Sequence, residues 1–252
     1  STLADGDKID MVTYVTAHEI AHQWWGHGVG WQNYHEQWLS ESFAQYFAAL
    51  YANENRGPEV FQGILRRMRR WAMSETRQGP VYLGYRVGHI KNNGRAFRAI
   101  VYNKGAMALH MLRQFVGDDV FFKGLQQFYL SSRFHKVGSE DFRLAMEQAS
   151  GRKLERFFER WIYGTSLPDI TFSSRTETAD TGQVVVLRFE QTGEIFDLPA
   201  MVTLEFTDGK TRDVLVRLDD RLTEMRVPVD RALKSVAISR QDVALADFRT
   251  VR

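Results

Sequence analysis

Two histidines on either side of a glutamate interrupt an apolar segment near the start of the sequence. The segment reads VTAHEIAHQWWGH, and its polar residues include His18, Glu19 and His22. Residues four apart in an α-helix lie on the same face, so His18 and His22 can bind one metal ion. Glu19 lies about 100° further around the helix, where its carboxylate can reach a metal-bound water. Zinc suits two imidazoles and a carboxylate with one position left open, so the spacing predicts a hydrolytic zinc site.

Two other interpretations of this pattern need no metal. A match to His-x-x-x-His around a glutamate arises by chance in roughly one sequence of this length in a hundred. A pair of buried histidines satisfied by ordinary hydrogen bonds is the second alternative. Placing polar groups in an otherwise apolar helix is costly unless they are paired, which favours the metal site.

A two-histidine site needs a third ligand from elsewhere in the chain. The candidates downstream are His27, His35, Glu36 and Glu41. His27 lies in a glycine-rich turn and His35 in a connecting segment, and both positions suit surface residues. Glu41 lies in the next helical pattern, and two packed helices can place one inward carboxylate beside the histidine pair.

The pattern of apolar residues changes character near residue 165, which predicts two domains, residues 1–166 and 167–252. Helical periodicity predicts helices over residues 7–25, 36–53, 58–75, 95–116, 118–132, 139–150 and 153–163. Residues 76–94 hold four glycines and a proline, so we expect a loop there. The first domain is therefore expected to be mainly helical.

Beyond residue 167 the pattern alternates with a period of two. It predicts strands over residues 183–191, 201–206, 211–218, 225–229 and 234–239, with a hairpin turn at Asp208-Gly209. Short strands at this spacing are typical of a small β-sandwich. The expected fold class is therefore α+β and multidomain.

The amino-acid composition argues against several classes of protein. Of 252 residues, 44% are hydrophobic and 25% charged, as in globular proteins, and the net charge of +2 argues against a nucleic-acid binder. The basic run at residues 66–70 is more typical of a solvated helix face than of a phosphate or membrane patch. The absence of cysteine excludes disulfides and thiolate metal sites, and no apolar run approaches the roughly 20 residues that span a bilayer. None of this assigns a cellular compartment.

Two separated motifs together resemble the M1 family of gluzincin zinc aminopeptidases. The first is HEIAHQWWGH followed by Glu41 in WLSESFAQYF, with eighteen residues between His22 and Glu41. The second is IVYNKGAMALHMLR, with Tyr102 ahead of Lys-Gly-Ala. The resemblance implies one zinc ion held by His18, His22 and Glu41. It also implies that Glu19 is the general base and that the Tyr102 hydroxyl stabilises the oxyanion.

The resemblance also implies a fold and an activity. From about Asp7 onward the chain is similar to the C-terminal part of a thermolysin-like catalytic domain and the small β-domain that follows it. The implied function is zinc-dependent release of N-terminal residues from a peptide or protein substrate. An endopeptidase or another metallohydrolase with the same triad is one alternative, and a non-catalytic interaction module that retains the fold is another. The presence of all five site residues disfavours that last alternative.

The sequence departs from the family pattern in two places. The usual Asn-Glu-Gly-Phe-Ala is here Ser-Glu-Ser-Phe-Ala at residues 40–44, and we expect the small serines to preserve the metal site. The Gly-x-Met-Glu-Asn stretch that binds the substrate amine in the family is absent, as is its first β-domain. We therefore expect an upstream part of the same polypeptide to supply both.

The segment at residues 84–91 is a candidate for lining the substrate site. The segment and its neighbourhood carry Tyr82, Tyr85, Arg86 and His89, and long loops often carry function. A solvated connector is the alternative interpretation. The substrate side chain that the site prefers is not predicted.

Overall fold

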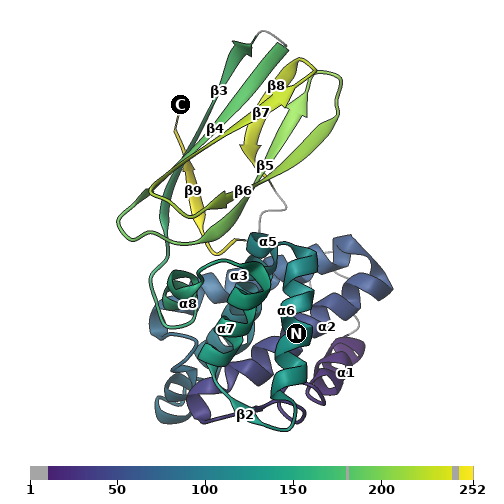
Figure 1. Ribbon diagram of the computed structural model, residues 1–252, viewed down its shortest axis with the longest axis vertical. Coiled ribbons are helices and arrows are strands. Elements are labelled where there is room, and N and C mark those ends of the chain that lie inside the picture. Colours follow the sequence, from purple (N-terminus) through teal and green to yellow (C-terminus); the bar gives the residue numbers. More distant parts are fainter. Residues whose placement is uncertain (1–10, 180–181, 240–243, 252) are drawn as a thin grey trace. The chain divides into compact units, whose positions relative to one another are not determined.

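A computed structural model describes residues 11–179, 182–239 and 244–251. The chain divides into two compact units, residues 1–166 and 167–252. The first unit is helical and the second is built of strands (Figure 1). The predicted α+β class, a helical portion followed by a small β-sandwich, is confirmed.

The first unit contains α-helices of very different length. They are α1 (Met11–Ala21), α2 (Trp38–Arg56), α3 (Pro58–Glu75), α4 (Gly94–Phe97), α5 (Gly105–Val116), α6 (Asp118–Ser132), α7 (Ser139–Ser150) and α8 (Glu155–Trp161). Two π-helical segments, η3 (Arg86–Ile90) and η4 (Arg98–Lys104), flank α4. Short 3-10 turns occur at η1 (Tyr34–Glu36) and η2 (Thr76–Gln78), and β1 (Gly30–Trp31) pairs in parallel with β2 (Lys136–Val137). No helix among the described residues is long and apolar enough to cross a membrane.

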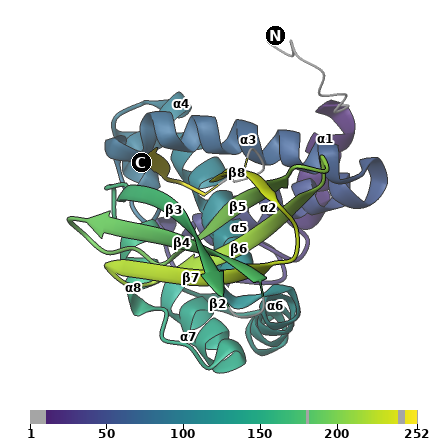
Figure 2. The ribbon, with the colours of Figure 1, turned by 90° about the horizontal axis from the view of Figure 1, so that it is seen from above.

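Helix α2 is the centre of the first unit. It packs against α1, α3, α5 and η4, while α6 and α7 lie side by side at the edge of the unit (Figure 2). Apolar side chains at helical spacing, among them Leu39, Phe43 and Tyr46, are buried against these neighbours. Each fully buried aromatic side chain contributes about 1.5–3 kcal/mol, so α2 is held firmly in place. A ligand on α2 therefore has a rigid support.

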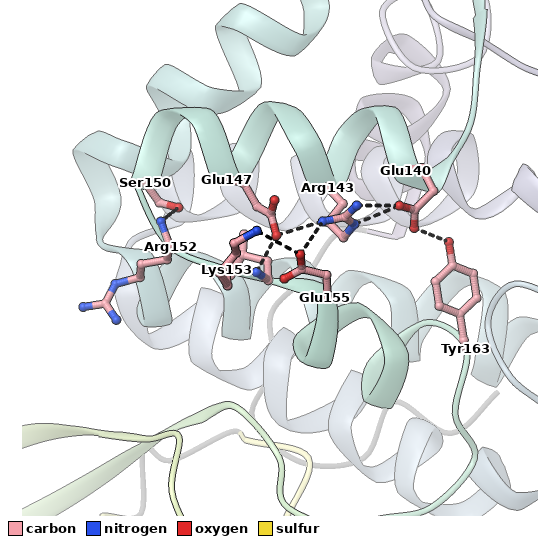
Figure 3. Close-up of polar contacts among 9 residues, drawn as sticks. Glu140, Arg143, Glu147, Ser150, Arg152, Lys153, Glu155 and Tyr163 are labelled. Atoms are coloured by element: carbon pink, nitrogen blue, oxygen red, sulfur yellow. Dashed lines mark hydrogen bonds and ion pairs between the residues drawn. The ribbon is translucent and has the colours of Figure 1, made fainter.

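A charged cluster joins α7 to the chain around α8 (Figure 3). The Arg143 guanidinium lies 2.7 Å from a Glu140 carboxylate oxygen, 2.8 Å from Glu147 and 3.6 Å from Glu155. The Tyr163 hydroxyl donates to Glu140 from beyond the end of α8. Since only 12% of the Arg143 side chain is exposed, these pairs are partly shielded from water and hold the last helices of the unit together.

The second unit contains two sheets with antiparallel pairing throughout except at its last strand. Its strands are β3 (Asp169–Ala179), β4 (Gly182–Thr192), β5 (Leu198–Phe206), β6 (Thr211–Leu218), β7 (Leu222–Val229), β8 (Leu233–Ile238) and β9 (Asp247–Thr250). One sheet has the order β7-β4-β3-β9, with β9 parallel to β3, and the other has the order β6-β5-β8. The predicted turn between β5 and β6 is confirmed, with Gly209 at φ 82°.

Several predicted element boundaries in the first unit are wrong. Helix α1 ends at Ala21 rather than at residue 25, because the chain turns away before Gly26. Gly26 has a φ of 122°, which is unfavourable for any residue with a side chain. The predicted start at residue 7 lies outside the described residues. Residues 76–94, expected as a loop, contain the η3 helical turn, and the expected helix over 95–116 is divided by η4.

The sequence pattern also missed strands of the second unit. Strand β3 lies between β4 and β9 only over residues 169–172. Residues 173–178, Ser-Ser-Arg-Thr-Glu-Thr, pair with β4 and have no apolar alternation. Its apolar contribution is concentrated at one end, where the Phe172 ring lies 4.8 Å from that of Phe189 on β4. The main-chain pairing with β4, not side-chain pattern, places the polar half of β3 in the sheet.

Candidate metal centre

The two motif histidines lie at the end of α1 and face the first turn of α2. His18 is within α1, and His22 directly follows its last residue while its amide still bonds to the His18 carbonyl at 3.3 Å. Glu41 lies in the first turn of α2, where the helix dipole favours a negative charge. The structure thus brings His18, His22 and Glu41 together from two packed helices.

Three donor atoms of these residues converge on one point. The Nε2 atoms of His18 and His22 are 3.1 Å apart, and Glu41 Oε2 lies 3.5 Å from the first and 3.4 Å from the second. Tetrahedral ligands bound to zinc at about 2.0–2.1 Å are separated by roughly 3.3 Å. The donor set and its spacing therefore fit a zinc ion without rearrangement.

Hydrogen bonds fix the orientation of the His22 ring. Its Nδ1 lies 3.0 Å from the Trp25 carbonyl oxygen and 3.0 Å from Ser40 Oγ, and Ser40 itself donates to that carbonyl. A proton on Nδ1 satisfies these contacts and leaves the Nε2 lone pair facing His18 and Glu41. An alanine at position 26 would bring its Cβ within 2.5 Å of Ser40 Oγ, so a glycine is required there.

The electrostatics of the cluster favour an ionised carboxylate. Burial would raise the pKa of Glu41, but hydrogen bonds from His18 and His22 outweigh it and lower that pKa to about 2. The pKa of His22 is raised, chiefly by its hydrogen bond with Glu41. The ionised carboxylate thus favours positive charge beside it, which a bound metal ion would supply.

Tyr102 lies against the same cluster. Its ring stacks on His18 with centroids 5.8 Å apart and an angle of 13° between planes. Burial, and then the negative charge of Glu41, raise the pKa of Tyr102, so the phenol keeps its proton at neutral pH. The phenol is therefore a hydrogen-bond donor, and its partner in this structure is Glu41.

The π-helical segment η4 sets the position of Tyr102 and is anchored on both sides. The Ser42 hydroxyl of α2 donates to the Val101 carbonyl, and a Cβ on Gly105 would overlap Ser42, so α2 and η4 approach closely. The fully buried Lys104 Nζ donates to the Gly164 carbonyl at 2.8 Å. Widened helical turns of this kind are frequent at functional sites.

Glu19 is the exposed member of the motif. It lies on α1 beside His18, and its charge contributes to the raised pKa values of both His22 and Tyr102. Its carboxylate is thus within electrostatic reach of the cluster but is not one of the converging donors. A solvent-facing carboxylate at this place can exchange protons with a bound water.

The other third-ligand candidates do not join the cluster. The Glu36 carboxylate accepts hydrogen bonds from the Ser139 amide at 2.9 Å and hydroxyl at 2.6 Å. His35 packs against Tyr82 and Tyr85, and the exposed His27 bonds to the His22 carbonyl. Each of these three side chains makes its contacts with atoms other than the three converging donor atoms.

The candidate substrate segment at residues 84–91 is helical rather than irregular. Its His89 ring lies 5.6 Å from Phe97, whose ring lies 5.9 Å from Tyr102. Tyr85 instead packs on Tyr34 and His35. One end of the segment thus reaches the site through Phe97, and the substrate-lining role stays a prediction.

Three residues that support the site were not predicted from the sequence. Ser40 and Ser42 were expected only to be tolerated, yet one orients His22 and the other bonds to the Tyr102-bearing segment. Their position on either side of Glu41 was the available signal. The buried amine of Lys104 had no signal in the chain beyond its place in the Tyr-Asn-Lys-Gly-Ala motif.

Comparisons with known proteins assign the chain to a family. Residues 2–161 match the peptidase family M1 domain. The chain is 27% identical over 195 residues to aminopeptidase N of Lactococcus lactis, and 30% identical over 149 residues to aminopeptidase N of Streptomyces lividans. These alignments cover 75% and 58% of this chain but only 23% and 17% of the relatives.

A solved structure has the same fold. The crystal structure of Legionella pneumophila aminopeptidase A in complex with aspartic acid matches with a TM-score of 0.73 at 19% identity. The match covers 96% of this chain and 28% of that one. Since the family domain covers more than half of the sequence, the chain belongs to peptidase family M1, a family of metallopeptidases that are generally zinc-dependent.

Proposed function

We propose that this chain carries the hydrolytic centre of a zinc-dependent aminopeptidase. The observation that supports the proposal most strongly is the convergence of three donor atoms, from His18, His22 and Glu41, within 3.5 Å of one another. The protonated phenol of Tyr102 beside them is the second support. A zinc ion held by these donors would act as a Lewis acid toward a water and a substrate carbonyl.

Three residues of the chain carry out proton transfer, oxyanion stabilisation and ligand orientation. Glu19 accepts a proton from the attacking water and passes it to the leaving amine. The Tyr102 hydroxyl donates a hydrogen bond to the oxygen that becomes negative as the carbonyl is attacked. Ser40 holds the His22 ring in the orientation that keeps its Nε2 directed at the cluster.

The role of Glu19 is tested by Glu19→Gln in the full-length protein. We expect unchanged zinc content and a fall in turnover of roughly 10²–10⁴-fold, because the amide cannot accept the proton. Glu54→Gln is the matched control, since Glu54 is an exposed glutamate on α2. Hydrolysis at the wild-type rate by Glu19→Gln would remove the assigned role.

The preference for a free N-terminus is tested separately. Peptides of one sequence are offered with a free and with an acetylated amine, and kcat/KM is compared. The aminopeptidase proposal requires a strong preference for the free amine. Equal hydrolysis of both would indicate an endopeptidase, and no hydrolysis of either by a zinc-loaded protein would indicate a non-catalytic module.

A further inference from the structure

A cavity of about 310 Å³ opens beside the metal cluster within the first unit. Helices α1, α2 and α3 and the segment η4 contribute its walls. This volume is at the lower end of the range for small-molecule sites, and it is enough for one side chain or a chain end of a peptide.

The cavity is continuous with the site residues. Tyr102 itself forms part of the wall. Val15 and Gln45 also line it, and they lie three residues before His18 on α1 and four residues after Glu41 on α2. Helical residues at these separations are neighbours on one face, so the cavity begins one turn away from both ligands. A substrate group adjacent to a carbonyl at Tyr102 would enter it.

The described lining residues of the cavity carry charge of one sign. Arg67 from α3 and Arg98 from η4 are both among them, and none of the lining residues within 11–179 is acidic. Apolar side chains, including Trp71, make up much of the remaining wall. Low-dielectric walls focus the field of the two guanidinium groups into the opening.

The two arginines come from α3 and η4, which pack against each other. The charge of Arg67 reaches Tyr14, where it opposes the rise that burial causes in the pKa of that phenol. Tyr14 is in turn fixed to α2 by a hydrogen bond to the Gln45 carbonyl. Both guanidinium-bearing residues therefore line the same cavity as Tyr102.

We propose that this cavity binds a substrate carboxylate next to the scissile bond, with Arg67 and Arg98 as the specificity-determining residues. Guanidinium groups bind carboxylates through paired, charge-assisted hydrogen bonds. The carboxylate can belong to an acidic side chain beside the scissile bond or to the C-terminus of a short peptide. The proposal rests on the proposed function, because it takes Tyr102 as the place of the reacting carbonyl.

Matched substrate pairs test the proposal on the zinc-loaded full-length protein. Glu-p-nitroanilide against Gln-p-nitroanilide tests an acidic first residue, and Ala-Glu-NH2 against Ala-Gln-NH2 tests an acidic second residue. Ala-Ala against Ala-Ala-NH2 tests the C-terminal carboxylate. We expect kcat/KM to be roughly 10-fold to 100-fold higher for the carboxylate in at least one pair, which also identifies its source.

Variants assign the preference to the cavity. Arg67→Gln combined with Arg98→Gln should abolish most of that ratio within the preferred pair. Arg66→Gln combined with Arg70→Gln is the matched control, because it removes two exposed positive charges from α3 that do not line the cavity. The proposal is overturned if no pair favours the carboxylate, or if the ratio in the cavity variant equals that in the control.

A binding measurement separates this proposal from the proposed function. Calorimetric titration of the same peptides into Glu19→Gln protein requires no turnover. Tighter binding of the carboxylate member, lost with Arg67→Gln and Arg98→Gln, supports the cavity assignment even if the wild-type protein hydrolyses nothing. Equal binding of both members contradicts it even if hydrolysis proceeds.

Discussion

Glu36 and Glu41 are five residues apart and largely buried, yet their surroundings give them opposite properties. Glu41 faces two imidazoles, and its pKa falls to about 2. Glu36 faces the Ser139 amide and hydroxyl, and burial raises its pKa despite those hydrogen bonds. The partners, not the depth of burial, decide whether a carboxylate is held ionised for a cation or serves as a structural acceptor.

The largest difference between the two carboxylates should appear in metal binding. Glu41→Gln removes the anionic donor of the cluster, so we expect loss of stoichiometric zinc and a fall in hydrolysis of at least about 10³-fold. Glu36→Gln should keep its zinc and its hydrolytic activity, because the amide oxygen can still accept hydrogen bonds from Ser139. Zinc content is measured after dialysis, and hydrolytic activity is measured as kcat/KM. If Glu36→Gln lost zinc as Glu41→Gln does, the contrast between them would be wrong.

Removal of the Tyr102 hydroxyl should have the next largest effect. Tyr102→Phe keeps the ring that stacks on His18 but removes the donor to the oxyanion, so we expect kcat to fall roughly 10²–10³-fold. Zinc content should not change. Steady-state kinetics with a neutral peptide checks the prediction, and Tyr51→Phe, an exposed tyrosine on α2, is the control. A Tyr102→Phe protein with wild-type kcat would mean that the stacking, not the hydroxyl, explains the position of the ring.

A smaller loss is expected where the support of a ligand is removed rather than the ligand. Ser40→Ala deletes a hydrogen-bond partner of His22 Nδ1 and leaves the Trp25 carbonyl in place. We expect zinc affinity to fall roughly 10-fold, the lower limit for such outer partners. Competition with a chelator of known affinity measures it. An unchanged affinity would show that the Trp25 carbonyl alone fixes the ring.

The smallest expected effect concerns the pH dependence of stability. Since the pKa of Glu36 is higher in the folded state than its ordinary value of 4.5, the folded protein keeps this proton longer than the unfolded chain as pH rises. The stabilisation is thus present below about 4.5 and is lost as pH rises through the folded value, by at most about 1.4 kcal/mol per pH unit. Urea unfolding between pH 4 and 7 should show Glu36→Gln gaining stability relative to wild type. A difference that is constant with pH would exclude a raised pKa.

The contrast between the two glutamates also shows which site residues could be predicted from the sequence. The i, i+4 spacing of His18 and His22 fixes their common face, so the pair was predictable from helix geometry alone. Choosing Glu41 over Glu36 required either the family resemblance or the structure, because both are acidic residues near the start of the same helical pattern. The partner of Glu36, Ser139, is about a hundred residues further along, and no local pattern indicates such a contact.

The π-helical segment η4 and the polar strand β3 could not be predicted from the sequence pattern, for a different reason. Apolar periodicity reports an average helical repeat, so it gave one helix over residues 95–116 where η4 widens the turn that carries Tyr102. Strand β3 was missed because its register is set by pairing with β4, while its exposed half is polar. Alternating apolar residues made β5 and β6 predictable, with buried and partly exposed positions in turn.

The proposed hydrolytic centre depends most on one cation bound by two imidazoles and one carboxylate. Crystals of the zinc-loaded full-length protein, measured on either side of the zinc absorption edge, locate that cation directly. We expect one anomalous peak per chain, about 2.0–2.2 Å from the Nε2 atoms of His18 and His22 and from an oxygen of Glu41. A crystal that takes up zinc elsewhere, or shows no peak between these three side chains, would contradict the account.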